Sequence, residues 1–295
     1  PDTDLFIKLS QIAIRVIREC APDAYVMMGS YSSFCHGIHK WTEEELAEKK
    51  NSDPFLKAIS VLAKDVDVIG YHPFYQIDVG SETMLEYSNS IVAFKRYCES
   101  CGFKGDRYMA SEYNFASNYP VPEKPPWGSA NYSEIQKAKI VAGVSVLHTA
   151  LNVESFFCEL WSSTYPMELS LMRRSFEGYP ISPLNPHAAY YAMRNLSTAL
   201  DELVEADFCI SADREYEKLE MWPMRREGEK VAAVWFAGVP SEDCDGQCIT
   251  FTIDGEAEDV RAFNCMTGEE FEMDFEMSVG QTVIKDVIVR DYPLL

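Results

Sequence analysis

Long apolar runs and basic residues are scarce in this sequence of 295 residues, and each scarcity argues against a class of protein. No window approaches the roughly 18 to 20 consecutive apolar residues that a membrane-spanning helix needs, so we do not expect a membrane protein. Lys and Arg number 26 against 47 Asp and Glu, which gives a net charge of −21. This balance argues against binding to nucleic-acid phosphates or to an anionic membrane surface.

Metal-ligand patterns are also missing. The nine Cys include the spacings Cys98-x2-Cys101 and Cys244-x3-Cys248, but neither has a matching second pair. We therefore expect buried thiols rather than a zinc site, and we predict neither a metal nor a cofactor. The chain begins with Pro1 and shows no charged-then-apolar leader, so we expect a processed product or a fragment. The compartment, secreted or cytoplasmic, stays open.

What is present is an ordinary globular composition, with 47% hydrophobic and 25% charged residues. Residues 1–204 alternate amphipathic and short apolar segments, which predicts helices and buried strands in turn. The expected helices cover 4–20, 43–64, 81–101, 133–150 and 185–203. The expected strands cover 24–31, 67–71, 106–113 and 154–161. This alternation predicts four parallel βα units, whereas a complete (β/α)8 barrel needs eight, so we expect either half of such a barrel or an open sheet.

The pattern changes in residues 205–295. Short alternating runs, separated by turn signals such as Asp254-Gly and Thr267-Gly, predict an accessory antiparallel β-sandwich. This segment holds 22 acidic and 8 basic residues, so it carries −14 of the net charge of −21. We interpret that acidity as a solvated face rather than as a binding site. The expected domains are thus 1–204 and 205–295.

Polar and aromatic residues follow the predicted strands of the first domain. Since the carboxyl ends of parallel strands meet at one edge, we expect these side chains to surround one site. A carboxylate, an imidazole, a phenol and an indole together suit a sugar. The candidates, including one loop aromatic, are His72, Tyr75, Glu112, Asn114, Trp127, Glu159 and Trp161.

The order of these motifs resembles the second half of a clan A retaining glycoside hydrolase. The matching segments are His72-Pro-Phe-Tyr75, Ser111-Glu112-Tyr-Asn114, the strand ending in Trp161, and Pro186-His-Ala-Ala-Tyr-Tyr191. The resemblance implies a (β/α)8 TIM barrel, represented by its last four βα units, that acts on a β-linked glycoside or a plant-type polysaccharide. It implies Glu112 as the nucleophile, with the other candidates binding the substrate.

One departure from the clan leaves alternatives open. The acid/base Glu of the clan, at the end of the fourth strand, has no match in this chain, and we expect it just upstream of Pro1. Candidate partners besides the carbohydrate are therefore the N-terminal half barrel and a second copy that completes the half barrel. A non-catalytic carbohydrate-binding half barrel is the competing hypothesis. Glu112 as a loop cap or ion-pair partner is the structural alternative.

Overall fold

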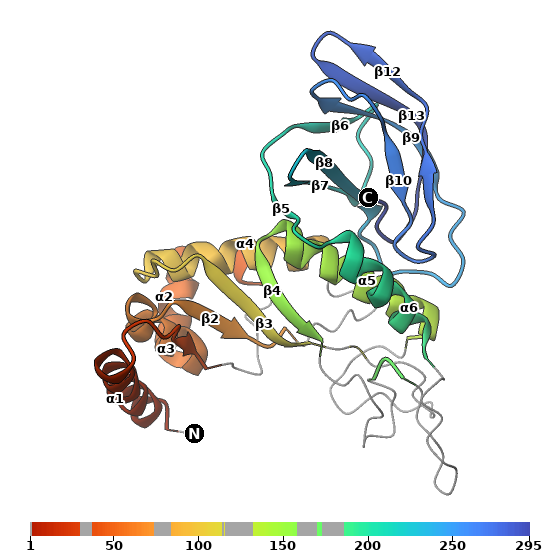
Figure 1. The fold of residues 1–295 in the computed structure, drawn as a ribbon. Coiled ribbons are helices and arrows are strands. Elements are labelled where there is room, and N and C mark those ends of the chain that lie inside the picture. Colours follow the sequence, from red (N-terminus) through yellow and green to blue (C-terminus); the bar gives the residue numbers. More distant parts are fainter. Residues whose placement is uncertain are drawn as a thin grey trace, which may run out of the picture. The chain divides into compact units, whose positions relative to one another are not determined.

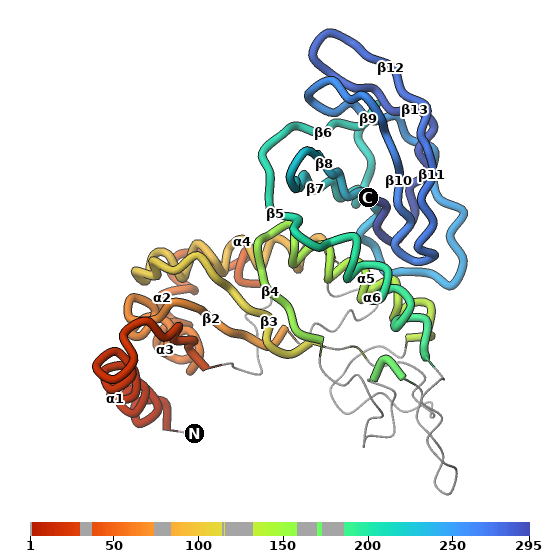
Figure 2. Tube along the Cα trace, viewed as in Figure 1, coloured from red at the N-terminus to blue at the C-terminus, as the bar shows by residue number. Residues whose placement is uncertain are grey.

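The computed structural model describes residues 2–29, 37–73, 84–113, 115, 132–157, 170–172 and 186–295. These residues form a mixed α/β protein with one parallel sheet and several antiparallel sheets (Figures 1 and 2). The contacts between residues divide the chain into two compact units. The first unit comprises residues 1–75, 86–113 and 153–157, and the second comprises 76–85, 114–152 and 158–295. The predicted boundary near residue 204 stays a prediction.

The first unit is built on a parallel sheet of four strands in the order β1-β2-β3-β4. The strands are β1 (Met27–Met28), β2 (Val68–Tyr71), β3 (Arg107–Tyr113) and β4 (Val153–Phe157). The helices are α1 (Thr3–Cys20), α2 (Glu43–Ser52), α3 (Pro54–Leu62) and α4 (Met84–Ser100), with 3-10 turns at Ile38–Lys40 and Ala63–Asp65. The predicted parallel βα order is thereby confirmed.

Aromatic packing attaches α3 and α4 to one face of this sheet. The Phe94 ring of α4 lies 5.7 Å from Phe55 of α3, 5.4 Å from Tyr71 of β2 and 6.5 Å from Tyr108 of β3. Phe55, Phe94 and Tyr71 have no exposed surface, so they form the centre of a dry core. At about 25 cal/mol per Å² of apolar surface, rings of this size are the main source of its stability.

The opposite face of the sheet is partly exposed among the residues that the structure describes. Met27 and Phe156 are 42% and 66% exposed, and Arg107 forms an ion pair across it with Glu154. Parallel sheets are ordinarily covered on both faces, because their strands are apolar on both sides.

The helix predicted over 43–64 is wrong as a single element. The helix is interrupted at Asp53, whose side chain accepts hydrogen bonds from the backbone N–H groups of Phe55 and Leu56. Pro54 follows as the first residue of α3, a position where its missing N–H costs nothing. Two helices, α2 and α3, result.

The second unit contains two helices and nine strands among its described residues. The helices α5 (Glu134–Ala150) and α6 (Ala188–Ala199) pack against each other. The strands are β5 (Val204–Glu205), β6 (Ile210–Ala212), β7 (Leu219–Arg226), β8 (Glu229–Phe236), β9 (Gln247–Asp254), β10 (Arg261–Phe263), β11 (Glu270–Glu272), β12 (Phe275–Ser278) and β13 (Gln281–Val289).

These strands form three antiparallel sheets, in the orders β12-β13-β9-β6, β5-β7-β8 and β10-β11. Their shared core includes Val234 of β8, Phe251 of β9, Ala262 of β10 and Val289 of β13. The predicted antiparallel β region is confirmed. The short strands β5, β11 and β12 were not predicted.

Candidate functional site

The structure places His72 and Glu112 together at the carboxyl ends of neighbouring strands. β2 and β3 pair in parallel up to Tyr71 and Ala110, so His72 and Glu112 both come just beyond this pairing. His72 Nδ1 lies 3.3 Å from Glu112 Oε2. The Ser111 hydroxyl donates to the Tyr71 carbonyl at 3.4 Å, a long bond that joins the two strand ends. Both residues are exposed in part, the His72 side chain by 19% and the Glu112 side chain by 40%.

A β-bulge decides where the Glu112 side chain points. Ala110 of β3 lies opposite Ser155 of β4, and Tyr113 lies opposite Phe157, so β3 has one extra residue between these pairs. Without the bulge, strict alternation puts Glu112 on the same face as Tyr108 and Ala110, which are buried. With the bulge, the Tyr113 side chain occupies the buried position and the Glu112 carboxylate is accessible to solvent.

Aromatic side chains pack around the strand ends, and their role is structural. The Tyr113 and Phe157 rings meet edge to face at 5.3 Å. Tyr71, directly before His72, is fully buried, and burial raises the pKa of its phenol far above the ordinary value. Tyr71 is thus a neutral packing residue at any physiological pH, and it limits the movement of the backbone that carries His72.

The other predicted site residues, Tyr75, Asn114, Trp127, Glu159 and Trp161, lie outside the described residues. Their arrangement around Glu112 stays a prediction, as do the roles assigned to all seven candidates. The described candidates are the neighbouring pair His72 and Glu112. The sequence analysis did not predict the bulge, because the segment around Ser111 and Glu112 contains no glycine or other residue that signals an extra residue in the strand.

The part of the chain that the structure describes contains neither a metal-binding cluster nor a disulfide. Among these residues, no group of three or more His, Cys, Asp or Glu is arranged to bind a metal ion. The seven described cysteines are free thiols, and two of them, Cys98 and Cys265, are buried. No helix in the described ranges is long and apolar enough to cross a bilayer.

Comparisons with known proteins give distant likenesses to solved structures. No family model and no curated protein matches the chain. It is similar to N2152 from Neocallimastix frontalis, with 13% identity and a TM-score of 0.40 over 96% of this chain and 63% of that one. It is also similar to a "putative beta-galactosidase" from Bacteroides fragilis, with 9% identity and a TM-score of 0.40 over 98% of this chain and 35% of that one. The chain spans less than two thirds of the length of either protein.

Proposed function

We propose that this chain belongs to a retaining glycoside hydrolase that acts on β-linked glycosides, with Glu112 as its nucleophile. The supporting observation is the contact of 3.3 Å between His72 Nδ1 and Glu112 Oε2 at the carboxyl edge of the parallel sheet. Active sites of barrels of parallel strands lie at this edge. The bulge supports the same assignment, since bulges that redirect one side chain are frequent beside active sites.

The chemistry requires one carboxylate that attacks and one carboxylic acid that protonates. Glu112 attacks the anomeric carbon through one oxygen and forms a glycosyl ester, while the aglycone leaves with a proton from the acid. Water then attacks the same carbon, gives its proton to the second carboxylate, and releases Glu112. With the proton on Nδ1, His72 donates toward Oε2 and orients the Glu112 carboxylate.

The second carboxyl group must stand about 5 to 5.5 Å from Glu112 in a retaining enzyme. We place it on a further βα unit rather than in this chain. In this proposal the parallel sheet is the last half of a (β/α)8 barrel, and the N-terminal half or a second copy completes the barrel at the edge strands β1 and β4. The exposed apolar residues of α1, Leu5, Leu9 and Ile12, support the presence of such an additional element.

Covalent trapping tests the nucleophile without depending on the acid. A 2-deoxy-2-fluoro-β-glycoside with a dinitrophenolate leaving group needs no protonation, so Glu112 alone decides whether a glycosyl ester forms. We expect the wild-type chain to gain the mass of one fluoroglycosyl group on the peptide that carries Glu112. Glu112→Gln should show no adduct, whereas Glu99→Gln, which removes an exposed carboxylate on α4, should react like the wild type.

The results separate the competing hypotheses. An adduct on another residue, or equal labelling of Glu112→Gln, would show that the nucleophile assignment is wrong. Saturable oligosaccharide binding that produces no adduct, and that Trp161→Ala abolishes, would instead identify a non-catalytic carbohydrate-binding half barrel.

A further inference from the structure

A cleft of about 670 Å³ opens at the amino ends of β2 and β3, at the edge of the sheet opposite to Glu112. Its charged lining consists of Arg15, Arg18, Lys64 and Lys104 with Asp65 and Asp67, which gives four positive and two negative charges. A positive excess is unusual in a chain with a net charge of −21. The cleft also lies within the size range of small-molecule sites, about 300 to 1,000 Å³.

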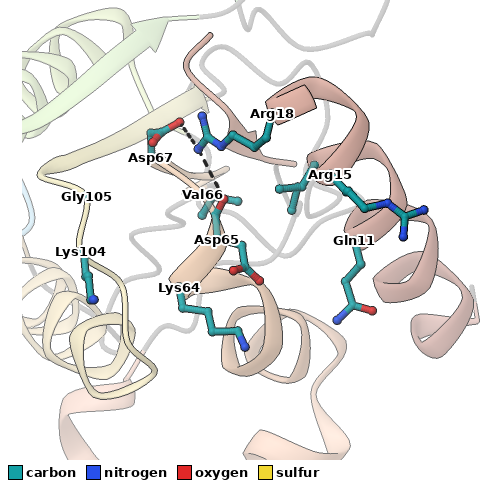
Figure 3. A pocket seen from close by; sticks show the side chains of 10 residues that line it. Gln11, Arg15, Arg18, Lys64, Asp65, Val66, Asp67, Lys104 and Gly105 are labelled. Carbon is teal, nitrogen blue, oxygen red and sulfur yellow. Dashed lines mark hydrogen bonds and ion pairs between the residues drawn. The ribbon is translucent and has the colours of Figure 1, made fainter. Parts of the chain in front are cut away.

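One of these arginines is already neutralised. Arg18 forms an ion pair with Asp67 at 2.7 Å (Figure 3). Arg18 also donates to the Ala24 carbonyl at 2.8 Å. The Val26 N–H donates to the same carboxylate at 2.7 Å and, with Arg18, lowers the pKa of Asp67. These bonds hold one wall of the cleft in place. The charged side chains that remain in the lining are three cations, Arg15, Lys64 and Lys104, and one anion, Asp65.

Close backbone packing brings Lys64 and Lys104 to the same cleft. A Cβ at Gly105 would stand 2.3 Å from the Asp67 carbonyl oxygen, so only glycine permits this approach of the two connections. A Cβ at Gly102 would lie 3.5 Å from the Cβ of Lys64. The segment before β3 is therefore held against the segment before β2. The exposed ammonium groups of Lys64, before β2, and Lys104, before β3, therefore line the same cleft.

Lys64, Lys104 and Arg15 form no ion pair with the residues that the structure describes. Like charges gathered in one hollow repel each other, and an anion that lies between them removes this cost. Ammonium and guanidinium groups both form short, charge-assisted hydrogen bonds to phosphate oxygens.

We infer that this cleft binds a small phosphate-containing ligand with at least two negative charges, and that Lys64 and Lys104 are its principal contacts. The ligand lies at the amino ends of the strands, away from Glu112, so the inference does not depend on the proposed hydrolase activity. Binding there adds a contact between α1 and the two connections, and above its dissociation constant it stabilises their arrangement with the logarithm of the ligand concentration.

Calorimetric titration of the 295-residue chain with inorganic pyrophosphate tests this inference. We expect saturable binding at an ionic strength of about 20 mM, where screening is weak, and a steep loss of affinity as salt is added. Lys64→Glu/Lys104→Glu should weaken binding at least tenfold. The matched control Lys49→Glu/Lys50→Glu reverses the same number of charges on α2 and should bind as the wild type does. Lys64→Gln/Lys104→Gln, with its thermal unfolding measured, separates lost binding from lost folding.

Three results would overturn the inference. Absence of binding to the wild type would eliminate the site. Equal weakening by the α2 control would show nonspecific attraction. Citrate binding as tightly as pyrophosphate would show that the cleft recognises negative charge without preference for phosphate, and the assigned ligand class would then be wrong.

Discussion

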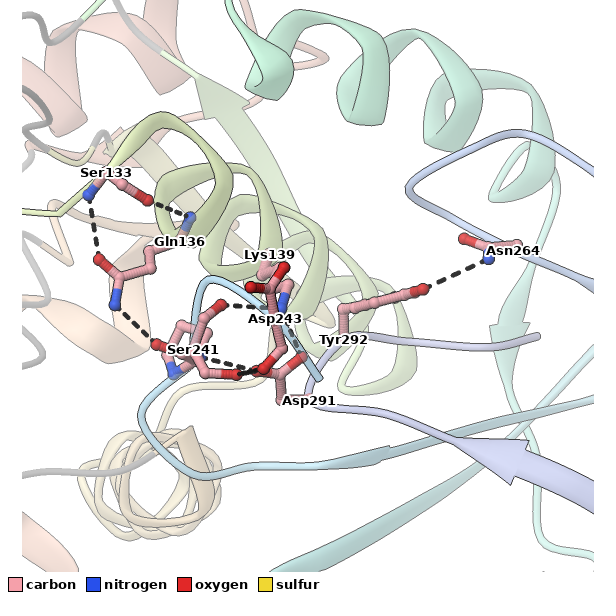
Figure 4. Close-up of polar contacts among 9 residues, drawn as sticks. Ser133, Gln136, Lys139, Ser241, Asp243, Asn264, Asp291 and Tyr292 are labelled. Carbon is pink, nitrogen blue, oxygen red and sulfur yellow. Dashed lines mark hydrogen bonds and ion pairs between the residues drawn. The ribbon is translucent and has the colours of Figure 1, made fainter. Parts of the chain in front are cut away.

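Lys139 of α5 is buried together with Asp291, and its replacement should be among the most damaging single changes in the second unit. Lys139 is 4% exposed and its Nζ lies 2.8 Å from Asp291 Oδ1 (Figure 4). Nζ also donates to the Ser241 carbonyl at 2.8 Å and lies 5.5 Å from the centre of the Tyr292 ring. The other oxygen of Asp291 accepts from the N–H and hydroxyl of Ser241, at 2.7 and 3.0 Å.

Lys139→Met keeps the length and apolar character of the stem but removes the charge. Asp291 then remains buried with only the two Ser241 bonds, and removal of one partner from a buried pair costs about 3 to 5 kcal/mol. Replacing both partners in Lys139→Met/Asp291→Leu leaves no unpaired charge. The double variant should therefore be more stable than the sum of the single effects predicts, by about 2 kcal/mol or more.

The assay is equilibrium urea unfolding, followed by tryptophan fluorescence and far-UV circular dichroism. Trp235 is fully buried in β8 of the same unit and reports its unfolding. Lys285→Met, which breaks an exposed pair with Glu276, serves as the control and should cost less than about 1 kcal/mol. A loss below about 1 kcal/mol for Lys139→Met, or strict additivity in the double variant, would refute this account of the buried pair.

Two further predictions concern the pH dependence of stability and the packing of a glycine. Burial lowers the pKa of His148 to about 3, below its unfolded value of about 6.5, so its contribution is complete above pH 6.5 and is lost as pH falls. Between pH 7 and pH 5 the wild type should lose about 2 kcal/mol that His148→Gln does not lose, and parallel urea-unfolding profiles for the two would contradict this. Gly105→Ala should cost about 1 to 3 kcal/mol in the same assay, because its Cβ meets the Asp67 carbonyl, whereas Gly29→Ala has room and should cost far less; equal losses would refute the packing argument.

Local chemistry in the sequence was sufficient to predict several helix starts. Thr42 with Glu45 and Ser133 with Gln136 stand at the starts of two expected helices, and both pairs form complete capping boxes. Such caps depend on side chains three residues apart, so no distant part of the chain is needed to form them. Pro54 is an equally local signal, and the helix break before it was predictable in the same way.

Exposure was harder to predict than periodicity. The apolar stripe on α1 includes Leu5, Leu9 and Ile12, yet all three are at least half exposed, and Ile7 is the buried residue of this helix. Hydrophobic spacing shows that a helix has an apolar face, but it does not show what covers that face.

Periodicity and capping act over a few residues, so they were sufficient to predict the order of the elements, four parallel βα units followed by antiparallel strands. It also singled out Glu112 and His72 as residues that follow neighbouring strands. Tertiary structure alone decided that Glu112 is accessible, because the extra residue in β3 appears only when its pairing with β4 is known. It likewise decided that Lys64 and Lys104 share a cleft, since their proximity depends on packing between segments about forty residues apart in the chain.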